Sequence, residues 1–249
     1  MTRSVCAVIC AAGKGTRAGF DKNKLLIPYQ GIPVLVRTVQ AFCFEGIDEI
    51  IVTYAHDDLT EMKALLSGFD NVRFVEGGGT RTASVYNALQ AVNSEIVLIH
   101  DGARPFVSRK VIEGCIHSVE AFGSGICAIP CTDTIAVKST TNEIVRVPDR
   151  NLLARVQTPQ GFYTQEILGA YQQAMEASKL HSVSYTDDSS VYADFTNKLP
   201  HLCEGAEENV KITYAGDFTN GIARCGFGVD THAFGKAQDY IVLAGVKIP

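Results

Sequence analysis

Cations and small residues gather in one short segment near the N-terminus. Residues 11–17 read AAGKGTR, and another lysine, Lys24, follows soon after Arg17. A loop with two glycines exposes backbone N–H groups that no Cβ covers, and such groups bind phosphate oxygens. A purely structural turn would also explain the glycines, but the convergence of cations favours a polyphosphate site formed by this loop, with these predicted members: Ala11, Ala12, Gly13, Gly15, Thr16, Arg17 and Lys24.

Two familiar phosphate-binding loops do not fit this segment. Walker A loops contain Gly-Lys-Ser/Thr, whereas the order here is Lys14-Gly15-Thr16. The dinucleotide fingerprint needs a third small residue for close packing of helix on strand; Ala18 could serve, but Arg17 beside it would crowd that packing. The loop therefore belongs to neither class.

Two more polar segments follow predicted strands. Gly77, Gly78 and Gly79 form a run that disfavours regular structure, and Ser84 falls in the first turn of the next predicted helix. A flexible turn is the alternative interpretation of this run. Residues 100–105 read HDGARP and place Asp101 directly after another buried strand. Ligands of open parallel sheets bind beyond the carboxyl ends of the strands, so we expect all three segments to border one crevice.

The residue types favour chemistry at phosphorus. The chain shows no Ser-His-Asp order and no paired catalytic carboxylates, whereas Arg17, Lys24 and Lys211 could neutralise developing negative charge. A phosphate monoester has a second pKa of about 6 and is already mostly dianionic at neutral pH. Such a nucleophile needs no general base, and we expect Mg²⁺ to bridge the triphosphate oxygens.

The elements that must position these residues alternate between strand and helix. Strands are predicted at residues 5–10, 49–54, 72–75, 95–99 and 125–129, and helices at 34–44, 57–66, 82–92 and 108–122. The apolar, β-branched run at 5–10 is typical of a central strand buried on both faces. This order predicts an α/β fold with a doubly wound, mostly parallel, Rossmann-like sheet.

The pattern changes after Pro130. Two alternating segments within 133–147, joined by a polar turn at 139–142, predict a β-hairpin arm within about 131–158. Because a lone hairpin is marginally stable, we expect this arm to pack on a second subunit and form a homodimer. Residues 149–162 look loop-like, followed by helices at 164–177 and 186–195, short strands at 199–203 and 209–213, and a helix at 215–223.

Composition and net charge argue against several classes of protein. The formal net charge of −5 argues against a nucleic-acid or anionic membrane surface, and no apolar run is long enough for a membrane span. With no signal-peptide pattern, we expect a cytoplasmic location. The eight cysteines lie mostly within apolar patterns and include no Cys-x-x-Cys pair, which favours reduced, buried thiols over thiolate zinc binding.

The combined motifs resemble a known enzyme family. AAGKGTR, Lys24, VEGGGTRTASV, HDGARP, DT at 133–134, DRN, QTPQGF, TDD and NVKIT occur in the order seen in 2-C-methyl-D-erythritol 4-phosphate cytidylyltransferases. The resemblance covers residues 4 to about 224. It implies a homodimeric, Mg²⁺-dependent nucleotidyltransferase that converts CTP and methylerythritol phosphate into 4-diphosphocytidyl-2-C-methyl-D-erythritol and pyrophosphate in isoprenoid biosynthesis.

The resemblance also implies site roles. The 11–17 loop and Lys24 would hold the triphosphate; Gly77, Gly78 and Ser84 would meet cytosine; Asp101 would face the ribose and the sugar phosphate. Arg104 and Lys211 would bind substrate from the same subunit, and the residues expected to reach in from the partner's arm are Thr134, Arg150 and Thr158. The chain departs from the family pattern at Asn23, Leu25, Gly79 and Tyr214-Ala215.

The C-terminal segment differs from this pattern. Residues 226–235 predict a strand carrying Asp230 and His232 on one face, with 240–248 as its hairpin partner. GFGVDTHAFG and IVLAGVKIP resemble the beginning of 2-C-methyl-D-erythritol 2,4-cyclodiphosphate synthase, whose opening segment supplies Asp and His to a zinc site. We therefore expect a 1–224 transferase domain and, at 225–249, only the start of a cyclase-like domain in a multifunctional protein, with an incomplete zinc half-site and no cyclase activity.

Two alternatives remain open at the level of sequence. Cytidylyl transfer to ribitol 5-phosphate is a related activity on the same fold, although the cyclase-like tail argues against it. A catalytically silent nucleotide-binding module would be compatible with the changes at Asn23, Leu25 and Gly79. Release of pyrophosphate distinguishes an enzyme from such a module.

Overall fold

The computed structural model describes residues 3–13, 22–180, 185 and 187–218, and the backbone of 241–243 and 246–248. The chain divides into two compact units, Met1–Phe218 and Thr219–Pro249. Each unit is described by itself. Among the helices of the described residues, none is long and apolar enough to cross a membrane.

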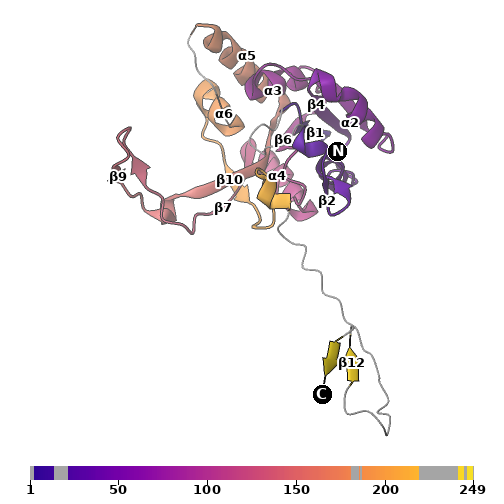
Figure 1. The fold of residues 1–249 in the computed structure, drawn as a ribbon. Coiled ribbons are helices and arrows are strands. Elements are labelled where there is room, and N and C mark those ends of the chain that lie inside the picture. The colour runs from indigo at the N-terminus through magenta and orange to yellow at the C-terminus, as the bar shows by residue number, and fades with distance from the viewer. Residues whose placement is uncertain are drawn as a thin grey trace. The chain divides into compact units, whose positions relative to one another are not determined.

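A seven-stranded sheet in the order β11-β7-β10-β6-β1-β4-β5 forms the centre of the first unit (Figure 1). Neighbouring strands are parallel except where β10 pairs with β6 and with β7. The predicted doubly wound, mostly parallel sheet is confirmed. Its strands are β1 (Val5–Cys10), β4 (Glu49–Tyr54), β5 (Val72–Glu76), β6 (Ile96–Asp101), β7 (Ser124–Pro130), β10 (Ala154–Tyr163) and β11 (Leu202–Glu204).

The helices cover both faces of this sheet. Side chains of α1 (Val34–Ala41), α2 (Leu59–Leu65) and α4 (Arg109–Phe122) belong to one hydrophobic cluster. Those of α3 (Arg81–Leu89), α5 (Thr164–Leu180) and α6 (Asp188–Thr196) belong to the other. Strand β1 contributes side chains to both clusters. Its residues Val5, Ala7 and Ile9 belong to the first cluster, and Cys6 and Val8 belong to the second. This alternation explains why residues 5–10 are apolar without interruption.

Three helices begin at side-chain caps. Thr80 accepts a hydrogen bond from the N–H of Ala83 at the start of α3, and Ser108 accepts one from Val111 at the start of α4. Asp187 caps α6 through the N–H of Ser189. Each cap satisfies an N–H group that has no partner within its helix and fixes the loop that precedes the helix.

The prediction that residues 149–162 form a loop is wrong, because β10 lies in the middle of the sheet. Its buried polar residues hid the strand, since Gln157 and Gln160 each have a specific partner. Gln157 donates to the carbonyl of Ala206 at 2.8 Å, and Gln160 donates to Asp187 at 2.6 Å. The register against β7 shifts between Val156 and Gln160, which also breaks the alternation that identifies a strand.

The predicted arm is present. Strands β8 (Val137–Lys138) and β9 (Ile144–Arg146) pair antiparallel, and β7 and β10 run from the sheet into this projection (Figure 1). Several of its large apolar side chains are exposed in the single chain, including Ile144 at 70% and Leu152 at 84%. Leu152 lies in a short 3₁₀ helix, Arg150–Leu152, that precedes β10.

Several shorter elements accompany the sheet and its helices. Strands β2 (Pro28–Tyr29) and β3 (Ile32–Pro33) form a small hairpin before α1, and 3₁₀ helices lie at Lys24–Leu26 and His56–Asp58. The predicted strand at 209–213 is wrong: this segment is irregular, and the N–H of Ile212 is bonded to the carbonyl of Ala103. The predicted helix at 215–223 is a 3₁₀ helix at Ala215–Phe218 as far as the described residues extend.

In the second unit, β12 (Ile241–Leu243) pairs antiparallel with β13 (Val246–Ile248). These two strands pair with each other, so the one partner strand predicted for 240–248 is wrong. The strand predicted at 226–235, with Asp230 and His232, lies outside the described residues.

Candidate active site

A pocket of about 680 Å³ opens where β1, β4, β5 and β6 end. This is the edge of a parallel sheet where ligands of such folds bind. The described residues that line it include these predicted site members: Ala12, Gly13, Lys24, Gly77, Gly78, Ser84, Asp101 and Lys211. Ala11 is buried at the end of β1, where its N–H donates to the hydroxyl of Thr53 at 3.0 Å.

Glycine is required at positions 77 and 78, because neighbouring residues leave no room for a Cβ there. A Cβ on Gly77 would lie 2.4 Å from the Cβ of Ala12, and one on Gly78 would lie 2.5 Å from that of Ala83. The hydroxyl of Ser84 fixes this loop, since it accepts from the N–H of Gly78 at 3.0 Å and donates to the carbonyl of Thr80 at 2.8 Å. The loop after β5 is thus held against the loop after β1.

Asp101 lies among three cations. Its Oδ2 accepts a hydrogen bond from Lys211 Nζ at 2.7 Å and is 3.8 Å from Arg104 Nε, while its Oδ1 is 3.8 Å from an Nη of Arg81. Burial raises the pKa of this carboxyl, but Lys211 and Arg81 outweigh it and lower the pKa to about 2. Asp101 is therefore ionised at neutral pH and organises the positive charge around it.

Lys24 is brought to the pocket by a short 3₁₀ helix. Asn23 caps this helix by accepting from the N–H of Leu25, and its amide donates to the carbonyl of Ala11 and to Asp58. Lys24 Nζ donates to the carbonyl of Ile212 at 2.7 Å. Asn23, which departs from the family pattern, thereby ties the lysine to the end of β1.

The segment that carries Lys211 is fixed by buried polar contacts. Asn209 is fully buried and donates from its amide to the carbonyl of Thr158 at 2.8 Å. Arg104 Nη1 donates to the carbonyl of Asn209 at 2.6 Å, whereas its buried Nε has no hydrogen-bond partner among the described residues. Arg104, predicted as a substrate contact, is not among the described residues that line the pocket, and it lies behind Asp101.

Comparison with known proteins identifies the family of the chain. Residues 5–224 match the family described as IspD, 2-C-methyl-D-erythritol 4-phosphate cytidylyltransferase. The chain belongs to this family. A cytidylyltransferase of Clostridium acetobutylicum is 41% identical over 218 residues, which is 85% of this chain and 93% of that protein.

The solved structures agree with this assignment. The 4-diphosphocytidyl-2C-methyl-D-erythritol synthase of Anaerococcus prevotii is 29% identical, with a TM-score of 0.77 over 88% of this chain and 94% of that one.

A bifunctional enzyme IspD/IspF of Rhodopseudomonas palustris is 34% identical over 261 aligned positions. That alignment covers 100% of this chain but 64% of the relative.

As a 2-C-methyl-D-erythritol 4-phosphate cytidylyltransferase, the chain is a nucleotidyltransferase of the non-mevalonate isoprenoid pathway. It transfers CMP from CTP to methylerythritol phosphate and releases pyrophosphate. The family uses CTP as its nucleotide.

One residue of the cytidylyltransferase pocket was missed by the sequence analysis. Arg81 lines the pocket and donates both Nη groups to the fully buried carboxylate of Asp188, at 2.7 and 2.6 Å. Asp188 also accepts from the hydroxyl of Tyr171. Arg81 lies in the TRT motif and Asp188 in the TDD motif. Nothing in the spacing of these motifs indicated that side chains of α3 and α6 contact each other.

The other predicted site residues lie in three places. Gly15, Thr16 and Arg17 fall outside the described residues. Thr134 and Arg150 are exposed in the arm region. Thr158 does not lie on the projecting arm: it is 5% exposed within the sheet, accepts from the N–H of Asp101 at 3.0 Å and lies 3.1 Å from His100 Nδ1.

The expectation that Thr158 reaches into a partner's site is therefore corrected. Its hydroxyl is engaged within its own chain, because the buried half of β10 begins before this residue.

Proposed function

We propose that the pocket between β1, β5 and β6 binds CTP and methylerythritol phosphate side by side. Glycine-rich backbone at Gly13 and the Lys24 ammonium would hold the triphosphate, together with Gly15, Thr16 and Arg17 of the same loop. Gly77, Gly78 and Ser84 would contact cytosine. The observation that carries this proposal is that Lys24 and Lys211, far apart in sequence, line one pocket around Asp101.

The substrate phosphate would bind beside Asp101. Arg104 supports this placement, because its Nη1 is fixed on Asn209 while its Nε remains without a hydrogen bond among the described residues. Lys211 would exchange its bond to Asp101 for contact with the incoming phosphate. A ligand that satisfied both cations would remove the cost of an unpaired buried donor.

The reaction would need no proton acceptor from the protein. The nucleophile is a phosphate monoester, which is mostly dianionic at neutral pH given a second pKa of about 6. Asp101 is the carboxylate among the described lining residues, and its pKa near 2 makes it a poor base. Lys24, Lys211 and Arg17 would therefore act by bringing two anions together and stabilising charge in the transition state.

We expect Mg²⁺ to bind together with the triphosphate. Magnesium in nucleotide sites is bound by one or two carboxylates together with substrate phosphates, and Asp101 would provide that carboxylate. When bound, the ion would supply charge neutralisation to the triphosphate. The zinc half-site suggested by Asp230 and His232 lies outside the described residues.

We also infer a homodimer joined through the arm. Exposed apolar side chains on a thin projection are unfavourable in water, and Ile144, Val145, Val147 and Leu152 are each more than half exposed in the single chain. A second copy packed on the arm would cover them. Thr134 and Arg150 would then reach the partner's substrate.

The C-terminal unit would be the start of a cyclodiphosphate synthase-like domain. The resemblance of residues 226–249 supports this, as does an alignment with a bifunctional relative that extends over the whole chain.

A coupled pyrophosphate assay tests the main proposal. The purified chain is given CTP and Mg²⁺ with either methylerythritol phosphate or ribitol 5-phosphate. We expect turnover with methylerythritol phosphate to exceed that with ribitol phosphate. Preferential use of ribitol phosphate would overturn the substrate assignment, and CTP binding without pyrophosphate release would indicate a silent module.

A further inference from the structure

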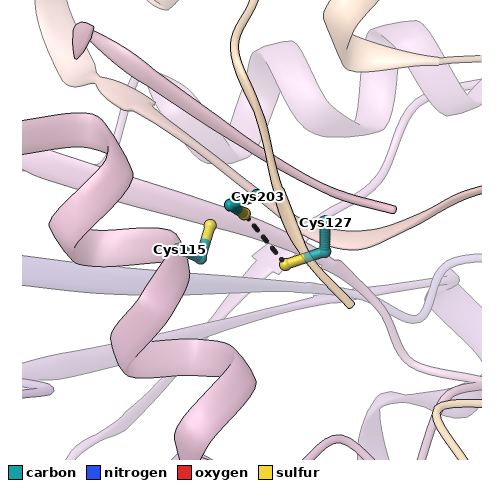
Figure 2. A group of neighbouring side chains, drawn as sticks. All are labelled: Cys115, Cys127 and Cys203. Carbon is teal, nitrogen blue, oxygen red and sulfur yellow. Dashed lines mark hydrogen bonds between the residues drawn. The ribbon is translucent and has the colours of Figure 1, made fainter. Parts of the chain in front are cut away.

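Three cysteines far apart in sequence meet beneath the edge of the sheet. Cys115 comes from α4, Cys127 from β7 and Cys203 from β11, and Figure 2 shows their side chains directed toward one another. All three sulfur atoms lie within 4.8 Å of each other, and Cys127 Sγ and Cys203 Sγ are 3.6 Å apart. Among the described residues no other His, Cys, Asp or Glu belongs to this group.

The surrounding fold holds this group in place. Cys127 and Cys203 are direct partners in the parallel pairing of β7 with β11, so their side chains leave the same face of the sheet. Helix α4 approaches that face closely because glycines lie beneath it. A Cβ on Gly161 would lie 2.9 Å from Cys115 Sγ, and one on Gly125 would lie 2.5 Å from the carbonyl oxygen of Cys115.

The three thiols are not chemically equivalent. Cys115 and Cys127 are fully buried, and Cys203 is partly exposed. Burial and the neighbouring thiols raise the pKa of Cys115. The pKa of Cys127 is lowered by Cys115 but raised more strongly by Cys203 and burial together. Contacts with Cys115 and Cys127 lower the pKa of Cys203 to about 4.

We propose that Cys115, Cys127 and Cys203 form a binding site for a thiophilic divalent cation of the Zn²⁺ and Cd²⁺ type. Zinc–sulfur bonds of about 2.3 Å in tetrahedral geometry place ligand sulfurs roughly 3.8 Å apart, close to the observed 3.6 Å between Cys127 and Cys203. The sulfur triangle therefore needs little rearrangement to surround a metal ion. The fourth position would be taken by solvent on the side of Cys203.

Metal binding would release the protons of the thiols. When a divalent cation forms bonds to all three sulfurs, the S–H protons of Cys115, Cys127 and Cys203 leave to solvent, and the three thiolates with the cation carry one negative charge.

Access to the site is through Cys203, the partly exposed member of the group. None of the three cysteines lines the neighbouring pocket of about 700 Å³. The absence of a Cys-x-x-Cys pair argued against thiolate zinc binding from sequence. That argument excludes a local zinc loop but not a site that tertiary structure assembles from three elements.

A metal here would stabilise the edge of the transferase sheet. Strand β11 is a short edge strand, and the chain continues from it through Asn209 to Lys211 in the pocket. A bond from Cys203 to a metal shared with α4 and β7 would anchor this strand in the folded state. Because the unfolded chain lacks the assembled site, bound metal should raise the unfolding temperature.

Titration of the full chain with Cd²⁺ in a thiol-free reductant tests the proposal. Sulfur-to-cadmium charge-transfer absorption reports thiolate ligands and is insensitive to Asp or His ligands. We expect one Cd²⁺ per chain with this absorption, and at least tenfold weaker binding in each of three variants: Cys115→Ser, Cys127→Ser and Cys203→Ser. The matched controls Cys43→Ser, at an exposed cysteine, Cys225→Ser and His232→Ala should bind like the parent.

A second measurement needs no variant. Cys203 is the accessible member, so Cd²⁺ should slow its alkylation by iodoacetamide at least tenfold, as followed residue by residue with mass spectrometry, while Cys43 reacts at an unchanged rate. The proposal is overturned if the parent gives no charge-transfer band, if Cys203→Ser retains it, or if Cys225→Ser or His232→Ala abolishes it. Equal alkylation of Cys203 with and without Cd²⁺ would also reject it.

Discussion

The ammonium of Lys211 lies 2.7 Å from Oδ2 of Asp101, although 110 residues separate them in sequence. This ion pair joins the irregular segment after β11 to the carboxyl end of β6. Through it, a cation from the end of the transferase unit reaches the same pocket as Lys24. The predictions below follow from the contacts around this pair and from the surfaces that the single chain leaves exposed.

Replacing Lys24 with alanine should reduce turnover at least a hundredfold. The variant loses a positive charge that stabilises the transition state, and loss of one such preorganised donor raises the barrier by about 3 to 4 kcal/mol. Steady-state pyrophosphate release measures the effect. Lys110→Ala is the control, because Lys110 is 81% exposed and outside this pocket, and it should turn over normally. A near-normal rate for Lys24→Ala would remove its assigned role.

Replacing Asp188 with asparagine should destabilise the protein and lower its activity. Asp188 is fully buried and holds Arg81 at the pocket, and loss of one partner of a buried pair costs about 3 to 5 kcal/mol. Urea unfolding measures the first effect and the KM for CTP the second. The exposed pair Arg109–Glu113 is the comparison, and Arg109→Ala should cost less than about 1 kcal/mol. Equal costs for the two variants would contradict this account.

His100 should make the protein less stable as the pH falls from about 6.5 to 4. Burial lowers the pKa of His100 to about 4, so across this range the unfolded chain binds a proton that the folded chain does not. The free energy of unfolding should therefore decrease by about 3 kcal/mol between those pH values through this residue, at 1.36 kcal/mol per pKa unit. Denaturant unfolding across the range, with His100→Gln as comparison, measures it. The variant should lose this part of the slope.

The hydrogen bonds of the His100 imidazole are consistent with its lowered pKa. His100 Nε2 lies 3.1 Å from the carbonyl of Arg104, so it carries the proton, and Nδ1 accepts from the hydroxyl of Thr158. A second proton on Nδ1 would face a hydroxyl that already accepts from the N–H of Asp101. An unchanged slope in His100→Gln would show that other groups dominate acid sensitivity.

Replacing Ile144 with aspartate should dissociate the proposed dimer. Ile144 is 70% exposed on β9, and a charge there would be buried without a partner in a dimer that covers the arm. Sedimentation velocity should show a shift toward monomer, with reduced activity because Thr134 and Arg150 would lose their partner's site. Leu199→Asp is the matched control, since Leu199 is 94% exposed and lies outside the arm. Dissociation by both variants alike would argue against an arm-mediated dimer.

Regular elements were predictable where one physical signal dominated. The apolar run at 5–10 gave the bounds of β1, and the helices predicted at 82–92 and 108–122 begin within one residue of α3 and α4, because burial and capping are local demands. Strand β10 was missed since its Gln157 and Gln160 are buried by partners from distant segments. No local pattern reports such partners.

The same limit applied to the pocket. Lys24, Asp101 and Lys211 were predicted together because glycine loops and strand ends mark a phosphate site. Arg81 was not, since its role depends on a carboxylate from α6, and Thr158 was expected in another subunit's site although it contacts its own Asp101. The cysteine group depends on a strand pairing that sequence spacing does not encode.

Strand β10 leads from solvent into the interior: its first three residues are exposed and the next six are buried. The exposed end thus belongs to the same strand as Thr158, which touches both His100 and the N–H of Asp101. A compound that bound the exposed end of β10 would act at a site separate from the pocket. Such an inhibitor would not have to compete with cellular CTP for its own binding place.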